Sequence, residues 1–486
     1  MLPAREADAI PGVSAEYREE IKELQTITGQ SLTWRARNVI APAAALLLTP
    51  LAARAQVPDN YMLDQYFAQG VPGYTNQEGT TVLSRARPEY DPLGIRVGDF
   101  IVRPELDESV GYNSNVIGQQ PAVGSAVIET SATIKVGSDW ARNSLGGSFN
   151  VTNTQVPSVS SQSNTTWNAA IGGSYDIGRD TLTVAATHMN AFILPYGIDV
   201  VSFNHPGVLY FAPIPYSLND VRVGYTSNFG RFSLTPAFDF TNVTYGTTNY
   251  FGLDGFVPPA AVNGFVLGSP QDLSYLNHDI YMGSLMAQYE YAPLRDFVAM
   301  VRGSSIQYTS PGSSALYGPS RNGTAFDALV GLDYTANGVW RYRLLAGYET
   351  RQYQNFKTHS APVFEADVIW QPQAVTTVTL KGERAIEDAV DLDVAGYVQT
   401  QARLQVDHEV RRNIILSGYG SIVNAQYLDS GGGAETFFGA GAGVTWLINR
   451  NVHVALTYDW LDHNGVNGFG PNYLQNVAML QLRLGI

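Results

Sequence analysis

The chain has 486 residues, and only 15% of them are charged, against roughly 25% in ordinary soluble domains. Its formal net charge is −14, and no cluster of lysine and arginine offers the positive surface that nucleic-acid binding requires. The absence of cysteine excludes disulfide bonds, thiolate metal sites and a cysteine nucleophile. We therefore expect neither a nucleic-acid partner nor a thiolate-bound cofactor.

The N-terminal residues have the pattern of a secretory signal. Arg35 and Arg37 precede an apolar run over residues 39–51, and Ala53 and Ala55 then place small residues just ahead of a cleavage point before Gln56. The run is shorter than the roughly 20 residues of a membrane-spanning helix, and it contains two prolines. We predict a signal peptide over residues 1–55. Its acidic beginning indicates either an extended signal or a start codon placed too far upstream.

Residues 56–95 contain four prolines and show no sustained alternation of apolar and polar side chains. A segment of about 40 residues makes a poor hydrophobic core. We therefore interpret residues 56–95 as a periplasmic leader rather than as a compact plug.

From residue 96 onward, apolar and polar side chains alternate with the period of two that is typical of strands. In residues 396–411 one face carries Val398, Leu404 and Val406, while the other carries amides and charges. Such a charged face does not suit a packed interior, but it suits a water-filled lumen. The same alternation recurs in residues 339–351, 451–460 and 479–486, the last of which ends the chain. The pattern predicts an all-β fold over residues 96–486, a single antiparallel transmembrane β-barrel.

The connections between these predicted strands alternate in length. Tight polar turns lie near residues 140–143, 178–180, 228–231, 293–296, 337–338, 372–373, 411–413 and 449–451. Longer connections lie near residues 193–215, 247–273 and 310–323. Short periplasmic turns and long extracellular loops are the rule in barrels of the Gram-negative outer membrane. We predict about 18 strands, with 16 left open, and a location in that membrane. A secreted β-sandwich or β-helix does not account for the alternating loop lengths.

The segment that leads into the first long strand carries a resemblance. Residues 87–100 read RPEYDPLGIRVGDF, then come Arg103-Pro104 and, over residues 111–116, GYNSNV. This stretch resembles the entry segment and first strand of the type 2 family of outer-membrane β-barrel porins. The resemblance implies an outer-membrane barrel, and it implies a link with polysaccharide, because members of that family are often associated with exopolysaccharide gene clusters. It supplies no catalytic residues.

The inward faces of the predicted strands carry charges of both signs. Opposite charges on neighbouring strands can pair and stiffen the wall, and rings of charge can select the solutes that pass. Both roles stay open for these residues. The predicted lumen-lining residues are Lys135, Arg222, Arg302, Asp327, Asp333, Arg341, Arg343, Glu349, Lys381, Glu383, Arg403, Asp407 and Arg483.

The longest internal connection, residues 247–273, is rich in aromatic side chains: Tyr250, Phe251, Phe256 and Phe265. Exposed to water, these side chains would form an apolar patch, so we expect the loop to fold inward. We predict that it narrows the barrel mouth as a constriction loop. Packing of the aromatic rings on one another and contact with sugar rings are both compatible with this placement.

The sequence carries none of the common catalytic or metal-binding motifs. It has no His-Glu-x-x-His, no Gly-x-Ser-x-Gly and no phosphate-binding glycine loop. We therefore expect no cofactor, no metal site and no enzyme. The best interpretation is an outer-membrane channel that passes oligosaccharide or assists exopolysaccharide export. A structural or binding barrel of a polysaccharide secretion assembly is the alternative, and an outer-membrane enzyme is the third. The expected partners are outer-membrane lipid, polysaccharide or oligosaccharide, and periplasmic export components.

Overall fold

The structure is a computed structural model that describes residues 71–72, 80–195, 197, 209–252, 270–309, 320–335, 338–389, 394–467 and 470–486. The chain divides into two compact units, Met1–Ala44 and Ala45–Ile486, and every described residue belongs to the second. The predicted signal peptide, residues 1–55, lies outside the described residues, as does the first part of the predicted leader.

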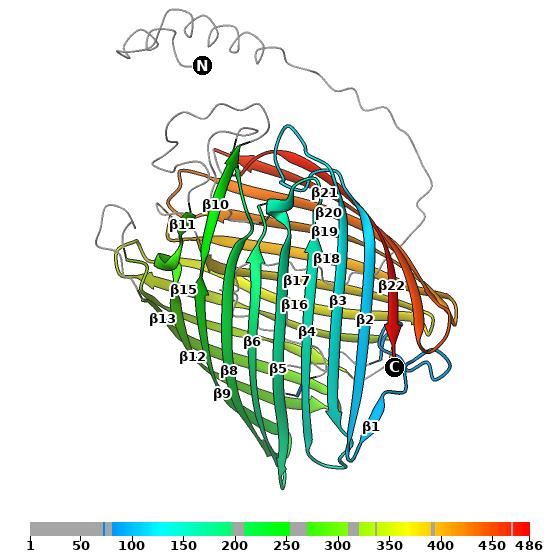
Figure 1. Ribbon diagram of the computed structural model, residues 1–486. Helices are drawn as coiled ribbons and strands as arrows, with labels where there is room; N and C mark the ends of the chain where they lie inside the picture. The colour runs from blue at the N-terminus through cyan, green and yellow to red at the C-terminus, as the bar shows by residue number, and fades with distance from the viewer. Residues whose placement is uncertain are drawn as a thin grey trace, which may run out of the picture. The chain divides into compact units, whose positions relative to one another are not determined.

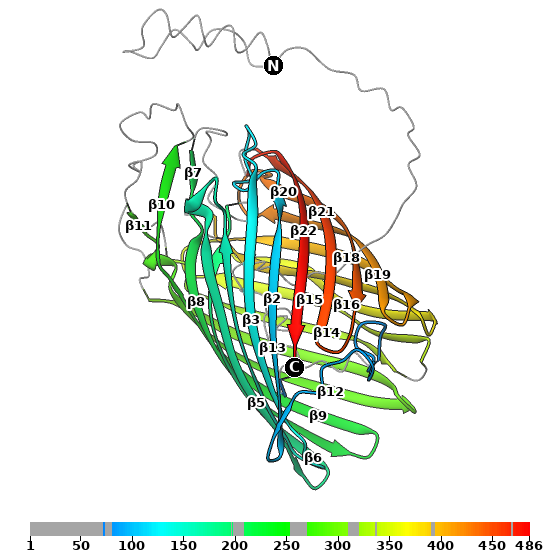
Figure 2. The same ribbon diagram turned by 45° about the vertical axis from the view of Figure 1, so that its right-hand side comes forward.

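The second unit is a closed antiparallel β-barrel (Figure 1). Eighteen long strands form its wall, and β2 pairs with β22 to close the sheet (Figure 2). The prediction of 18 strands is therefore confirmed. The strands of the wall are β2 (Phe100–Asn113), β3 (Ser125–Ser138), β4 (Ser144–Gln155), β5 (Asn164–Ile177), β6 (Asp180–Ile193), β8 (Ile214–Phe229), β9 (Phe232–Tyr245), β12 (His278–Ala292), β13 (Arg295–Tyr308), β14 (Gly323–Tyr334), β15 (Trp340–Tyr353), β16 (His359–Gln373), β17 (Thr376–Asp388), β18 (Gly396–Arg411), β19 (Ile414–Tyr427), β20 (Ala434–Leu447), β21 (Val452–Val466) and β22 (Tyr473–Gly485).

The short elements lie outside this wall sequence. β1 (Ile95–Val97) pairs with the start of β2. A separate three-stranded sheet consists of β7 (Leu209–Phe211), β10 (Thr247–Gly252) and β11 (Pro270–Asp272). Two single turns of 3₁₀-helix are η2 (Ser160–Gln162) and η3 (Ser274–Leu276). Among the described residues, no helix is long and apolar enough to cross a membrane.

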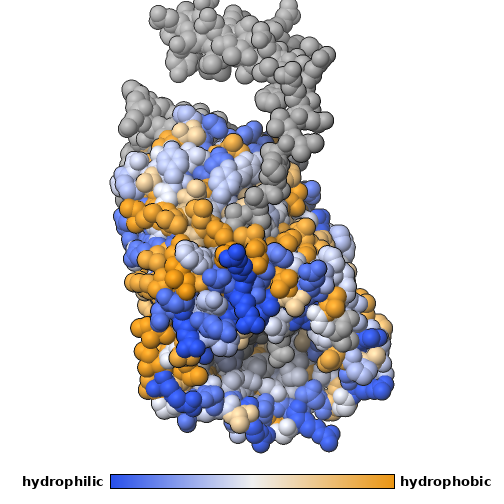
Figure 3. Space-filling view, turned by 90° about the vertical axis from the view of Figure 1, so that its right-hand side faces the viewer, coloured by the Kyte–Doolittle hydropathy of each residue, from blue (hydrophilic) through white to orange (hydrophobic). Residues whose placement is uncertain are grey.

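The period of two in the sequence gives the wall one apolar and one polar face. In β22, Leu480, Leu482 and Leu484 are exposed on the outer face, whereas Gln481 between them is buried on the inner face. Exposed large apolar side chains recur in the same phase on the other strands, and Figure 3 shows them spread widely over one face of the molecule. The barrel thus has an apolar exterior and a polar lumen.

The two ends of the barrel differ in the length of their connections. At the end where β2 begins and β22 ends, the turns are short; only two residues join β5 to β6, β8 to β9 and β18 to β19. At the other end the connections are longer, and residues 246–277 join β9 to β12. The predicted alternation of short turns and long loops is present. We name the two ends the turn end and the loop end.

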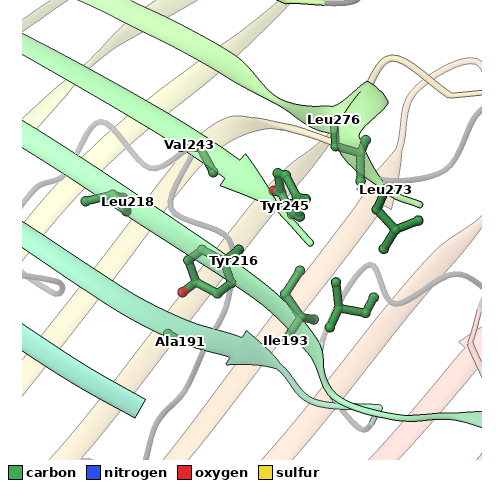
Figure 4. Packing of buried hydrophobic residues seen from close by; sticks show 9 residues of the cluster. Ala191, Ile193, Tyr216, Leu218, Val243, Tyr245, Leu273 and Leu276 are labelled. Atoms are coloured by element: carbon green, nitrogen blue, oxygen red, sulfur yellow. The ribbon is translucent and has the colours of Figure 1, made fainter. Parts of the chain in front are cut away.

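At the loop end, part of the inner face is apolar because a loop covers it. Tyr216 and Leu218 of β8 and Val243 of β9 point inward together with Ile193, and they pack against Leu273 and Leu276 around η3 (Figure 4). Leu273 and Leu276 are buried, so the described end of the loop between β9 and β12 lies against the inner face of the wall.

Candidate functional site: the lumen of the barrel

The structure places every predicted lumen-lining residue on the inner face of the wall. Each points to the same side of its strand as the buried polar side chains, of which Asp107 in β2 and Ser417 in β19 are examples. The exposed apolar side chains point to the other side. Several of these residues form cross-strand ion pairs. The pairs are Lys135–Glu105 at 3.4 Å, Arg222–Asp239 at 2.6 Å, Lys381–Asp367 at 3.8 Å and Arg483–Asp107 at 2.7 Å.

One buried network crosses β13, β14 and β16. The Arg302 guanidinium donates to both carboxylate oxygens of Asp327 at 3.0 and 2.9 Å, and through its Nη1 to Glu365 at 3.0 Å. Arg302 and Asp327 are less than a tenth exposed. Register explains the contact, because Arg302 stands directly opposite Asp327 on the neighbouring strand. This network ties neighbouring strands of the wall together.

A second network lies near the loop end. Arg351 is fully buried and pairs with Asp388 at 2.6 Å and with Glu349 at 3.3 Å. The Tyr353 hydroxyl also donates to Asp388 at 3.0 Å, and the Ile386 backbone N–H donates to Glu349 at 3.0 Å. Since Asp388 ends β17, this network ties the wall to the start of the loop that follows.

A third cluster leaves polar groups at the surface of the lumen. The Arg403 guanidinium lies over the Tyr419 ring, 3.7 Å from its centre, and the Tyr419 hydroxyl donates to Asp459 at 2.5 Å. All three residues are partly exposed. Gly441 leaves room for the Tyr419 ring, because any side chain at position 441 would overlap that ring. Here a cation, an aromatic ring and a carboxylate meet on the wall of the lumen.

Acidic side chains outnumber basic ones on the inner face of the described strands. The predicted basic residues, Arg103 and Arg351 face an acidic set of Glu105, Asp107, Glu129, Asp220, Asp239, Asp327, Asp333, Glu349, Glu365, Asp367, Glu383, Asp407, Glu409, Glu435 and Asp459. Several of these carboxylates accept hydrogen bonds from neutral groups; Glu383 accepts from Gln401 at 2.6 Å, and Asp407 from Gln405 at 3.0 Å. A lumen with excess negative charge favours cations and neutral solutes over anions.

The predicted constriction loop is described only at its two ends. Tyr250 and Phe251 belong to β10, which pairs with β7, while Phe256 and Phe265 lie outside the described residues. The inward packing of Leu273 and Leu276 agrees with a loop that folds toward the lumen. The placement of the predicted aromatic constriction stays a prediction.

Sequence reasoning missed two features of the wall. Glu108 lies on the outer face between Leu106 and Val110, where its carboxylate accepts a hydrogen bond from Thr130 at 2.8 Å. The sequence pattern could have revealed this position, because Glu108 shares the alternate positions of β2 with the apolar side chains and so belongs to the outward-facing set. The second feature is the contact of residues 80–92 with the inner face at the turn end. Those residues have no periodicity that could have indicated it.

A closed antiparallel wall with an apolar exterior and a charged lumen defines the class of outer-membrane β-barrel channels. The chain belongs to the family described as "Putative beta-barrel porin 2", whose model matches residues 87–485. It is therefore an outer-membrane protein of a Gram-negative bacterium. The match covers almost the whole barrel and confirms the resemblance noted in residues 87–116.

Solved structures with a similar fold have very different sequences. The copper transporter OprC is 8% identical, covers 81% of this chain and 81% of its own length, and has a TM-score of 0.44. OccAB3 of Acinetobacter baumannii is 10% identical over 80% of this chain and 100% of its own, with a TM-score of 0.42. OpdK of Pseudomonas aeruginosa, solved with vanillate, is 9% identical over 79% and 99%, with a TM-score of 0.41. No curated protein sequence matches the chain.

Proposed function

We propose that this porin is a passive channel that passes oligosaccharides across the outer membrane or assists the export of exopolysaccharide. The observation that carries the proposal is the polar, charged inner face of a closed wall of 18 strands. Walls of 16–18 strands are wide enough to leave an aqueous channel between their side chains.

The chemistry of the lumen supports a carbohydrate cargo. In the cluster of Arg403, Tyr419 and Asp459, charged groups that can bond to hydroxyls stand beside an aromatic ring that can contact a sugar. The excess of inward carboxylates disfavours anionic solutes. Among carbohydrates we therefore favour neutral oligosaccharides or a neutral polymer over an acidic polysaccharide.

Single-channel recording in planar bilayers tests this function. Purified, folded protein should give discrete conductance steps at neutral pH, with a reversal potential that indicates cation preference in a salt gradient. A neutral oligosaccharide series should reduce the current in a manner that depends on concentration. The Arg403→Ala variant should weaken that block. If folded protein gave no conductance steps, that result would contradict the proposal.

The contacts of residues 80–92 at the turn end favour a second candidate, a binding or structural barrel of a polysaccharide secretion assembly. Such a barrel would hold periplasmic export components without conducting ions. The same recordings separate the two functions, because a purely structural barrel gives no conductance steps. Neither candidate assigns a catalytic residue, and no group of three or more metal-ligating side chains occurs within the described residues.

A further inference from the structure

Residues 80–92, which we name the strap, contact the inner face of the wall at the turn end. The Thr80 carbonyl accepts hydrogen bonds from Arg341 at 2.9 Å and from Gln371 at 2.7 Å. Further along the strap, the Tyr90 carbonyl lies 2.9 Å from His453 Nε2. Arg341, Gln371 and His453 belong to β15, β16 and β21, so the contacts of the strap at the mouth of the barrel extend from β15 to β21.

An apolar anchor fixes the first part of the strap. Val82 is fully buried and packs with Ile415 of β19 and Leu447 of β20. Its backbone N–H donates to the Thr377 hydroxyl of β17 at 2.9 Å. Burying one valine side chain is worth about 1.5–3 kcal/mol. The anchor is therefore strong enough to hold a short segment in place.

A charged anchor fixes the next part of the strap. Glu409 of β18 pairs with Arg87 at 2.9 Å and with Arg85 at 3.2 Å, and Arg87 is 7% exposed. Arg87 also donates to the Val82 carbonyl at 2.5 Å, which joins the two anchors. Two guanidinium groups thus meet one carboxylate at the mouth, while Glu89 and Asp91 leave the strap as a whole without net formal charge.

A contact on the opposite wall completes the arrangement. Val71 is 1% exposed, and a side chain on Gly172 of β5 would overlap the carbonyl of Pro72. Gly172 has the inward phase of its strand. In the closed sheet, eight strands separate β5 from β17 in either direction. The chain ahead of the barrel is therefore held at both sides of the lumen, by Val71 and Pro72 at one side and by the strap at the other.

We propose that the strap is the constriction of the conducting pore at the turn end, and that Arg85 and Arg87 on it set the ion selectivity there. The strap stays in place during conduction, and solutes pass through the part of the lumen that the strap does not fill. This inference rests on the proposed channel function. It assigns selectivity to side chains that precede the barrel, in addition to those of the wall.

The first test compares two pairs of charge changes in single-channel recordings. Arg85→Gln/Arg87→Gln should shift the reversal potential toward greater cation preference, because the strap loses both of its cations and keeps the carboxylates of Glu89 and Asp91. The control, Arg142→Gln/Arg179→Gln, removes two exposed charges from turns at the same end and should leave the reversal potential unchanged. Equal shifts in both variants, or none in the strap variant, would overturn the assignment of selectivity.

The second test measures the size of the pore. Replacing residues 80–87 by an equal number of glycines and serines removes both anchors and should raise the conductance roughly twofold or more, as expected when a constriction is lost. Heat-modifiable migration on gels shows that the barrel has folded. An unchanged conductance in the folded variant would overturn the proposal.

A disulfide lock gives an answer even if that replacement fails to assemble. The chain has no cysteine, and the backbone N–H of Val82 lies 2.9 Å from the side-chain hydroxyl of Thr377, so these two neighbouring positions suit an engineered cysteine pair. Oxidised Val82→Cys/Thr377→Cys should conduct like the wild type, because the strap is in place in the open pore. Loss of conductance on oxidation, restored by reduction, would mean that the strap leaves the lumen during conduction, which contradicts the proposal. A wild-type protein without conductance would refute the channel function itself.

Discussion

The lipid-facing position of Glu108 leads to a prediction about two neighbouring leucines of β22. Leu480 stands opposite Val110 and Leu456, so an arginine there would have only apolar neighbours. Arginine on the lipid face of an outer-membrane barrel costs about 2–4 kcal/mol near the midplane and less toward the interfaces. Leu480 lies near the middle of β22, and we expect Leu480→Arg to lower the free energy of unfolding by about that amount.

Leu482→Arg should cost less because Leu482 stands directly opposite Glu108. An ion pair between them should recover about 1 kcal/mol, the upper end for a cross-strand pair. That recovery should disappear in a Glu108→Gln background. The comparison separates the effect of the ion pair on the free energy of unfolding from the effect of the shallower membrane depth of residue 482. Gln481→Arg, on the inner face, serves as the control and should cost less than about 1 kcal/mol.

Urea unfolding in lipid vesicles, followed by tryptophan fluorescence, measures these free energies. A double-mutant cycle between positions 108 and 482 gives the coupling energy directly. Zero coupling would show that Glu108 does not share the outer face with Leu482. A cost for Gln481→Arg as large as that for Leu480→Arg would refute the assignment of faces to β22.

Three further predictions concern the lumen and the loops. Arg302→Met leaves the carboxylates of Asp327 and Glu365 without their cation and should destabilise the barrel by about 3–5 kcal/mol, measured by urea unfolding. Hydrogen bonding from Lys357, with a further contribution from His359, lowers the pKa of Asp429 in the loop between β19 and β20. A carboxyl with a lowered pKa stabilises the folded state above its unfolded pKa of about 3.9 and loses this effect as the pH falls through the folded value. The heat stability of Asp429→Asn should therefore be lower than that of the wild type at pH 7, and the difference should vanish at acidic pH. Deletion of residues 250–266 should raise the single-channel conductance and weaken block by sugars if the predicted constriction loop narrows the loop end, and an unchanged conductance in a folded barrel would exclude that role.

The wall of the barrel could be predicted from the sequence because one physical rule controls each strand. Lipid outside and water inside require alternation, so the charges in residues 396–411 fall on the inner face of β18 as the pattern indicates. The same rule places Arg302 and Asp327 in the lumen. It also predicts the turn positions, since short polar breaks must separate the strands at one end.

The strap and the covered inner surfaces could not be predicted in this way. Arg87 and Glu409 lie 322 positions apart in the chain, and nothing in the irregular residues 80–92 indicates which strands they meet. Leu218 and Val243 point inward although they are apolar, because a loop rather than water covers them. Alternation states which face of a strand a side chain occupies, but not what lies against that face.

Single-channel conductance of the purified, folded full-length protein tests the central claim most directly. The account predicts discrete, cation-preferring conductance steps that neutral oligosaccharides reduce and that rise when residues 80–87 are replaced by glycine and serine. Folded protein that inserts into the bilayer and gives no steps, with the strap or without it, would contradict the claim that this barrel is a channel.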